Sequence, residues 1–576
     1  MARKSLALVV LIAVCSGWLL LFSLHAVGAV PSSAIGVAPP GTFVSPSDPQ
    51  TAAAAPAPQA AAAAGVQTAG VLTYAVGSDA DGLDPALNWS PMSLLVGAQV
   101  CETLVNYEPG GTLPVAGLAR TWSVSSDGLD WTFTLQPGVL FHDGTSLDAA
   151  AVVYNIERWW DPAHPYHQDS FFYFGYIFGG FRGEDGCSIA AVTERGTDQV
   201  RITLKAADNR LPTLLAMPFF AIASPSAIRA GTLQGAPVGS GPFRFDFWAP
   251  GELVRLTANV DYWGGRPRLD ALVFQVIPDP DARLTALQSG AVQGAAELGP
   301  SQVAAAIQDR NLQVLWRAAT SVGYLGINRA HPPLDNPLVC QAIAHAIHKQ
   351  AIVSQDYNST APVAQVARQL LPPAIWSYDP GLQDYSYDPG LARSLLAQAG
   401  YTDGVTTTLW VMPVSRPYMP QPSAIAASIQ ADLQAVGIHV TLVNYDLRTY
   451  LAKVLGGEAD LFELGWMLDY GHPYNLLGNV VCAGDASFGP RDAVLCDQVQ
   501  GALREVDLQQ QTAIYQAASR RVHDTLPMVP LAHVRDAVVV RSNVRGVVPA
   551  VLFAGSFKGV YFGSVQFLPV LKRGAP

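Results

Sequence analysis

The chain has 576 residues, of which 50% are hydrophobic and 14% are charged, so it is too long for one compact core and has apolar material for several. This composition excludes a wholly disordered protein. The formal net charge of −11, without a long run of Lys or Arg, would repel phosphate backbones, and we expect no nucleic-acid partner.

The N-terminus has the layout of an export signal. Arg3 and Lys4 precede an uncharged apolar stretch over residues 6–24. Three fates of this segment fit the sequence: cleavage after Ala29, retention as a membrane anchor, and lipidation of Cys15. In each case the protein is exported, to the periplasm or the outer face of the cytoplasmic membrane.

Two further uncharged segments follow. Residues 30–68 consist mainly of Ala, Pro, Ser and Gly, a composition that predicts an unfolded tether. Residues 211–228 are long enough to suggest a membrane span, but Pro212, Pro218 and Pro225 interrupt them. We interpret this second segment as a buried strand with its connections.

From Gly70 onward, strand and helix signals alternate, which is typical of an α/β protein. Apolar residues alternate with polar ones over 131–135 and 200–204, and both runs predict half-buried strands. The sequence also indicates where several helices begin and end. Asp279 and Asp388 each precede a proline, Gly290 and Gly400 follow about ten residues later, and a further helix over 423–437 leads into a strand over 438–442.

A series of short phrases resembles one family when taken in order. They are DGLDP at 81–85, ETLVNY at 102–107, GLA at 117–119, FHDGT at 141–145 with a helix over 149–159, GSGPF at 239–243, DYWGG at 261–265 and YLGIN at 324–328. Together they resemble the family 5 extracellular solute-binding proteins of ABC importers, which include dipeptide, oligopeptide and nickel binders. The resemblance runs from about residue 70 to about residue 547.

This resemblance implies a periplasmic-binding-protein-like α/β fold, with two lobes joined by hinge strands and an extra subdomain on the first lobe. The expected segments are the signal or anchor at 1–29, the linker at 30–69, lobe I at 70–110, the extra subdomain at 111–221, lobe I again at 222–319, lobe II at 320–528, and a last lobe I segment with the tail at 529–576.

The resemblance also implies a ligand site between the lobes. In WMLDY at 466–470, Asp469 matches the residue that binds a peptide's amino group, and in MPVSRPY at 412–418, Arg416 matches the clamp on the ligand carboxylate. Tyr418 and Trp466 would line the cleft, and the backbone around Gly82 would close it. Without the resemblance, Asp469 would be a turn or helix cap, Arg416 a surface charge and Trp466 a core residue.

Two positions depart from the family pattern. His472 stands where the family commonly carries a second acid, and Met419 stands where dipeptide binders usually carry a polar residue. The function that the resemblance implies is capture of short, dipeptide-like peptides for a membrane permease with a separate ATPase. A nickel-chelate or other small-solute binder of the same family remains the alternative.

The cysteines follow the same resemblance. Cys482 and Cys496 match a disulfide pair of the dipeptide-binding relatives, whereas no pairing is assigned to Cys101, Cys187 and Cys340. His164 and His167 are interpreted as surface histidines, because Pro165 lies between them and no third metal ligand is near.

We expect no metal, no cofactor and no enzymatic activity. The alternative from another class is an exported hydrolase, but the sequence contains no nucleophile elbow, zinc-protease motif or phosphate loop. The expected partners are the peptide ligand and the permease, and the protein is expected to be a monomer.

Overall fold

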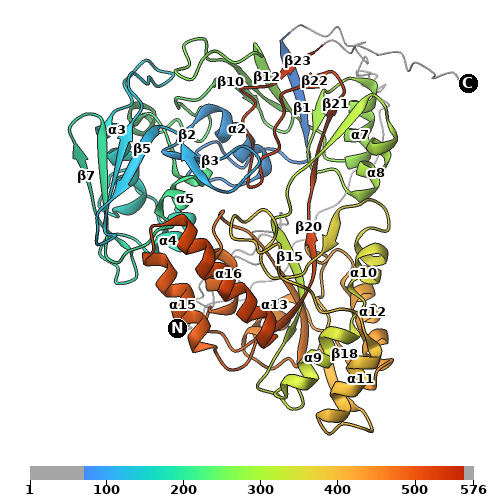
Figure 1. Ribbon diagram of the computed structural model, residues 1–576. Helices are drawn as coiled ribbons and strands as arrows, with labels where there is room; N and C mark the ends of the chain where they lie inside the picture. Colours follow the sequence, from blue (N-terminus) through green and yellow to red (C-terminus); the bar gives the residue numbers. More distant parts are fainter. Residues whose placement is uncertain (1–69, 564–576) are drawn as a thin grey trace, which may run out of the picture.

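The computed structural model describes residues 70–563, which are built on two large sheets and one smaller sheet (Figure 1). The export segment and the tether predicted over residues 1–69 lie outside the described residues. Among the helices of the described chain, none combines the length and the apolar character needed to cross a membrane.

The first lobe contains a seven-stranded sheet, drawn at the top of Figure 1. Strand β1 pairs in parallel with β12 and β13, so the start of the described chain lies in the middle of this sheet. In order, the strands are β10 (Phe243–Ala249), β11 (Leu253–Ala258), β12 (Ala271–Val276), β1 (Val71–Val76), β13 (Gly294–Ala295), β21 (Ala537–Arg541) and β14 (Leu312–Trp316). Its helices are α2 (Pro91–Val100), α7 (Pro280–Ser289) and α8 (Pro300–Gln308).

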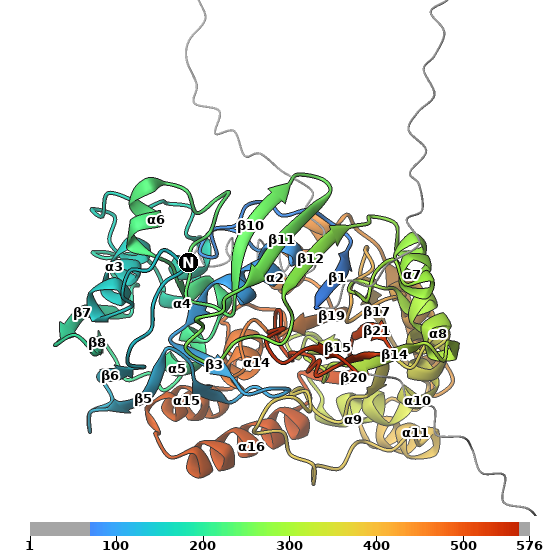
Figure 2. The ribbon, with the colours of Figure 1, turned by 90° about the horizontal axis from the view of Figure 1, so that it is seen from above.

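A four-stranded antiparallel sheet forms a separate unit of the first lobe, seen beside the seven-stranded sheet in Figure 2. Its strands are β5 (Ala119–Val124), β6 (Asp130–Leu135), β8 (Gln199–Leu204) and β7 (Ile189–Arg195). The elements around it are α3 (Ala149–Trp160), α4 (Phe172–Phe178), α5 (Leu211–Leu215), a 3₁₀ turn (Pro218–Phe220) and α6 (Pro225–Ala230). Short pairs also occur between β2 (Glu102–Thr103) and β9 (Ala221–Ile222), β3 (Val105–Tyr107) and β4 (Pro114–Ala116), and β22 (Val544–Arg545) and β23 (Tyr561–Phe562).

The second lobe contains a six-stranded mixed sheet and the largest hydrophobic cluster of the described residues. Its strands, in order, are β16 (Ala364–Val366), β20 (Met528–Val534), β15 (Ser321–Ile327), β19 (Leu461–Met467), β17 (Val405–Trp410) and β18 (Ile438–Val443). Its helices are α9 (Pro337–Ala346), α10 (Lys349–Ile352), α11 (Pro389–Gln398), α12 (Pro422–Gln434), α13 (Leu447–Leu455), α14 (Tyr474–Leu476), α15 (Ala493–Gly501) and α16 (Leu508–Thr525), with shorter turns at Val353–Tyr357, Leu477–Val481 and Ala502–Arg504.

Two crossings connect the lobes. The chain leaves the first sheet after β14 and enters the second with β15, and it returns between β20 and β21. The crossings lie side by side, because the Arg317 N–H donates to the Asp536 carbonyl at 3.0 Å and the two side chains form an ion pair at 3.6 Å. The last boundary was expected at residue 528, whereas β20 pairs within the second sheet through Val534.

Local sequence signals correspond to the elements that they predicted. Strands β6 and β8 alternate partly exposed with buried residues. The Asp279 side chain accepts a hydrogen bond from the Ala282 N–H and caps α7, and Asp388 caps α11 in the same way through Leu391. The predicted two-lobed α/β fold is therefore confirmed.

The prediction of a buried strand over residues 211–228 is mostly wrong. This segment forms α5, a 3₁₀ turn and the start of α6, and only Ala221–Ile222 is a strand. The prolines explain the difference, since Pro212 and Pro225 stand in the first turns of helices, where a missing N–H costs nothing. The segment is nevertheless largely buried, as expected.

Candidate functional site

Strand β19 leads directly to Asp469. The strand lies in the middle of the second sheet, and it is almost wholly buried from Leu461 to Trp466. Asp469 follows two residues after the strand ends, and only 4% of its surface is exposed. A carboxylate in such a place costs free energy unless hydrogen bonds or an opposite charge compensate it.

Asn475 supplies part of that compensation, although the sequence did not single it out. Its Nδ2 donates to Asp469 Oδ2 at 3.1 Å, and its Oδ1 accepts the Asp469 N–H at 3.2 Å. The same Oδ1 accepts the Trp466 indole N–H at 2.9 Å. Asn475 is fully buried, so these three bonds fix the carboxylate and the indole together.

Arg416 and Tyr418 lie in the loop between β17 and α12. A tight hairpin holds this loop, because the backbones of Arg416 and Met419 exchange two hydrogen bonds of 3.0 and 2.9 Å. Both side chains are buried, with 6% of Arg416 and 4% of Tyr418 exposed. Arg416 is therefore not the surface charge that its sequence context alone would suggest.

Two paired glycines let the loop approach the sheet. Gly323 of β15 lies opposite Gly465 of β19. A Cβ on Gly323 would lie 2.2 Å from the Tyr418 carbonyl oxygen, and one on Gly465 would lie 2.2 Å from the Tyr418 ring. The Tyr357 hydroxyl also donates to the Tyr418 carbonyl at 3.1 Å. The sequence shows both glycines, but only the strand register shows that they face one loop.

The contacts of Gly82 are with residues of the first lobe. Its φ is +144°, and a Cβ would lie 2.0 Å from Gln234 Oε1, so this position requires glycine. Its carbonyl accepts the Ser93 hydroxyl at 2.6 Å. Nearby Asp84 forms a buried ion pair with Arg158 of α3 at 2.5 Å, which connects the DGLDP turn to the four-stranded unit.

His472 is a buried neutral imidazole. Its Nδ1 accepts the Tyr474 N–H at 3.2 Å, and the edges of its ring meet Trp376 and Tyr515. Burial, reinforced by the positive charge of Arg210, lowers the pKa of His472 to about 3. Where the family commonly has a second acid, this chain therefore carries a side chain without charge at neutral pH.

Glu463 is a second buried group beneath the site. Its Oε2 accepts the Met412 N–H at 3.0 Å, at the start of the loop that carries Arg416. Burial raises the pKa of the Glu463 carboxyl well above its ordinary value. The protonated form is thereby favoured, so Glu463 supports the loop without placing a charge under it.

The two lobes touch beside Asp469. Tyr470, the next residue, packs into the hydrophobic cluster of the four-stranded unit of the first lobe. Gly471 approaches even more closely, since a Cβ there would lie 2.6 Å from the Thr112 carbonyl oxygen. The Thr112 hydroxyl in turn donates to the Ala374 carbonyl of the second lobe at 2.8 Å. The segment that carries Asp469 is thus part of the interlobe contact.

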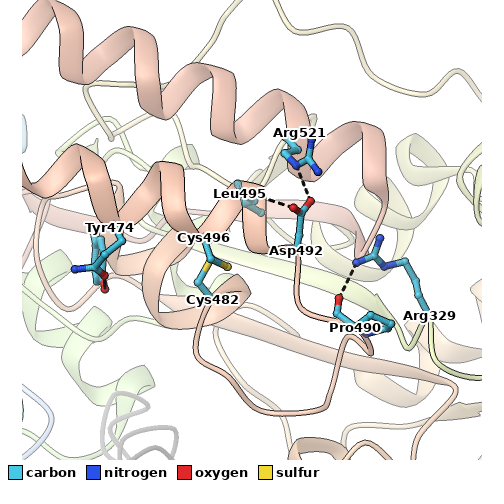
Figure 3. The surroundings of a disulfide bond; sticks show 9 residues. Arg329, Tyr474, Cys482, Pro490, Asp492, Leu495, Cys496 and Arg521 are labelled. Atoms are coloured by element: carbon cyan, nitrogen blue, oxygen red, sulfur yellow. Dashed lines mark hydrogen bonds and ion pairs between the residues drawn. A yellow bond between two sulfur atoms is a disulfide. The ribbon is translucent and has the colours of Figure 1, made fainter.

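A disulfide joins Cys482 to Cys496, as the resemblance predicted (Figure 3). It connects the segment after Asp469 to α15. Asp492 caps α15 through the Leu495 N–H and accepts Arg521 of α16 at 2.6 Å. The disulfide therefore attaches the segment that follows Asp469 to the helix pair α15 and α16, which the Asp492–Arg521 contact holds together.

The remaining cysteines and His167 are packed within the first and second lobes. Cys101, Cys187 and Cys340 are buried thiols outside any disulfide. His167 is bonded through Nδ1 to the Arg158 carbonyl at 3.0 Å, and its ring packs against Phe171 and Phe181. It is therefore a packed side chain rather than the surface residue that was expected. No group of three potential metal ligands occurs within residues 70–563.

Known proteins resemble this chain over most of its length. The dipeptide-binding protein of Escherichia coli is 32% identical over 511 residues, which cover 85% of this chain and 94% of that protein. The structure of HbpA2 from Haemophilus parasuis matches with a TM-score of 0.80 and 30% identity, over 86% of this chain and all of that one. A dipeptide-binding protein from Pseudoalteromonas in complex with Met-Leu matches with a TM-score of 0.64 and 26% identity, over the same shares.

The family model of the bacterial extracellular solute-binding proteins, family 5, matches residues 114–488. This span exceeds half of the chain and includes both Arg416 and Asp469. The chain therefore belongs to the family 5 bacterial extracellular solute-binding proteins, which serve transport and are not enzymes.

Proposed function

We propose that this protein captures short, dipeptide-like peptides between its lobes and delivers them to an ABC permease that a separate ATPase drives. The observation that carries the proposal is a buried carboxylate, Asp469, whose side chain and backbone are both held by Asn475. The names of similar proteins, including the dipeptide-binding protein of Escherichia coli, support it.

The chemistry suits a peptide zwitterion. Asp469 would bind the ammonium group, and the planar guanidinium of Arg416 would bind the carboxylate with two parallel hydrogen bonds. A charge-assisted hydrogen bond of this kind contributes about 1.5–3 kcal/mol. Burial of both side chains strengthens such bonds, because water competes less for them.

The other predicted residues receive supporting roles in this proposal. Tyr418 would form a wall of the cleft, positioned by its close packing on Gly465. Trp466 would act mainly through the hydrogen bond that orients Asn475. The turn at Gly82 would contribute to closure from the first lobe.

We also propose that the protein acts as a monomer at the outer face of the cytoplasmic membrane or in the periplasm. Membership of an extracellular solute-binding family supports export. Retention of the apolar segment at residues 6–24 would anchor the protein, and cleavage would release it. Mass spectrometry of the intact protein, purified from both the membrane and the soluble extracytoplasmic fraction of its native cells, separates these two outcomes, as well as lipidation at Cys15.

The test is calorimetry with Met-Leu, its N-acetylated form, its C-terminal amide and a nickel chelate. We expect Met-Leu to bind and both blocked forms to lose most of their affinity. Asp469→Asn should cost about 2 kcal/mol or more, which is about 30-fold in Kd. Equal binding of free and N-acetylated Met-Leu would contradict the amine clamp. Binding of the chelate alone would replace the peptide proposal with the nickel alternative.

A further inference from the structure

A short segment of the first lobe reaches across to the second. Asn209 stands between β8 and α5, and its N–H donates to the Leu503 carbonyl at 2.9 Å. Its side-chain Nδ2 donates to the carbonyls of Ala502 and Glu505 at 2.8 and 2.6 Å. Residues 502–504 form a 3₁₀ turn, so Asn209 adds three hydrogen bonds from the first lobe to carbonyls at the end of this turn.

Arg210 adds a charged contact beside Asn209. Asp208 holds its guanidinium through Nε at 2.9 Å and Nη2 at 2.6 Å. The same guanidinium donates to the Tyr470 hydroxyl at 3.1 Å and lies 4.3 Å from the centre of the Tyr474 ring. Although burial favours the neutral acid, Arg210 holds the pKa of Asp208 below its usual value, so the pair remains ionised.

The receiving surface on the second lobe is one connected unit. Tyr470 and Tyr474 flank the turn that follows Asp469, and the Tyr474 hydroxyl bonds to Gln500 Oε1 of α15 at 3.1 Å. Helix α15 continues directly into the turn that accepts Asn209. The disulfide connects Cys496, in the first half of α15, to Cys482 in the segment that follows Asp469.

We infer that Asp208, Asn209 and Arg210 form an interlobe latch that holds the Asp469 segment in its binding position and keeps the lobes together over the ligand. The inference rests on the proposed function for the ligand, but the contacts themselves do not depend on which solute is bound. Arg210 is in this sense a positioning residue, because it acts on Asp469 through Tyr470 and Tyr474.

A control substitution within the first lobe separates an interlobe latch from ordinary packing. Arg182 offers a comparison within the first lobe, since it pairs with Asp161 at 2.6 Å and lies over the Trp160 ring at 4.9 Å, although its side chain is more exposed than that of Arg210. It therefore makes the same two kinds of contact as Arg210 without reaching the second lobe. Substitution of Arg182 controls for the loss of an ion pair and a ring contact.

The experiment compares Asn209→Ala, Arg210→Met and Arg210→Lys with Arg182→Met in the full chain. Stopped-flow fluorescence measures the association and dissociation rates of Met-Leu, and thermal melting verifies that each variant folds. We expect Asn209→Ala and Arg210→Met to raise the dissociation rate about tenfold and to change association far less, because truncating one partner of a desolvated contact acts on dissociation. Arg210→Lys should restore part of the effect, and Arg182→Met should bind like the parent.

Hydrogen exchange at residues 469–476 provides a readout that needs no ligand. We expect faster exchange of these amides in Asn209→Ala and Arg210→Met than in Arg182→Met. Unchanged exchange in both latch variants would overturn the inference, as would dissociation rates equal to that of the parent. If the parent itself failed to bind Met-Leu, the peptide proposal would fall, and the exchange result would still decide the latch.

Discussion

Asn475 grips Asp469 at two points, its side-chain Oδ2 at 3.1 Å and its backbone N–H at 3.2 Å. The carboxylate cannot rotate away without breaking the first bond, and the second bond keeps Asn475 beside the Asp469 backbone. The same Asn475 also satisfies the buried Trp466 indole. One amide therefore links the core of the second lobe to the proposed amine clamp.

Replacement of Asn475 by alanine should weaken peptide binding about tenfold, because Asp469 loses the bonds that orient it and each buried hydrogen bond contributes about 1 kcal/mol. Calorimetry with Met-Leu measures the change. Asn155 is the matched control, since it is also fully buried and makes a comparable pair of bonds with Ala223 inside the first lobe. Asn155→Ala should lower the melting temperature without altering affinity. Equal affinity in the parent and Asn475→Ala would contradict the role assigned to Asn475.

Gly471→Ala should act as a wedge between the lobes. The added Cβ would lie 2.6 Å from the Thr112 carbonyl oxygen, a distance that forces one lobe to shift. Overpacking of this kind costs about 1–3 kcal/mol. Because the clash lies between the lobes, it destabilises the arrangement in which they touch, and calorimetry should show weaker peptide binding. Gly235→Ala is the control, because a Cβ there meets no atom within 4 Å. If both variants bound Met-Leu equally well, close lobe contact at Gly471 would be irrelevant to capture.

Buried histidines should make stability fall in acid. Burial lowers the pKa of His142 and His533 to about 4 and that of His472 to about 3, from an ordinary value of 6.5. As the pH falls below about 6.5, these histidines become protonated in the unfolded chain but stay neutral in the native protein. The free energy of unfolding therefore decreases from about pH 6.5 toward pH 3–4. Glu463 acts in the opposite sense, since its raised pKa makes the native protein lose stability as the pH rises above 4.5.

The variant His472→Gln removes the contribution of one of these histidines to the pH dependence of stability. The variant should show a shallower decline of stability between pH 6 and pH 4.5, by up to about 1.4 kcal/mol per pH unit. Urea denaturation at several pH values measures this slope. Identical slopes for the parent and His472→Gln would show that His472 is not held neutral.

The disulfide should stabilise the second lobe. Cys482 and Cys496 are 14 residues apart, and closing a loop of that size contributes about 3 kcal/mol in the chain-entropy model. The Cys482→Ser/Cys496→Ser variant should melt at a lower temperature than the parent. Dithiothreitol should shift the parent toward the variant and leave the variant unchanged. A parent that melts identically with and without the reductant would argue against any stabilising role.

Much of the fold could be predicted because its signals are local. The cap at Asp279 and the alternation over residues 131–135 depend on neighbours in the sequence, and both correspond to the elements they predicted. Residues 211–228 were harder, since short apolar runs suit strands and buried helices equally. The prolines argued against a membrane span but did not by themselves distinguish helix from strand.

The site was predictable only in part. Resemblance pointed to Asp469 and Arg416, whose roles as ligand contacts remain predictions, as do the segment boundaries apart from the last one. Asn475 carried no signal, because its importance arises from a turn that folds back on Asp469. The contact of Arg210 with Tyr470 joins residues 260 positions apart, and no local pattern reports such a distance.

The paired crossings between the sheets make the second lobe an insertion into the first. It enters after Arg317 and leaves at Asp536, two positions joined by a hydrogen bond, so its entrance and exit occupy one spot on the first lobe. Arg416, Tyr418 and Asp469 all lie within that single uninterrupted stretch. Exchange of this one stretch between relatives would therefore transfer all three of these proposed ligand residues together, while the rest of the protein keeps its own sequence.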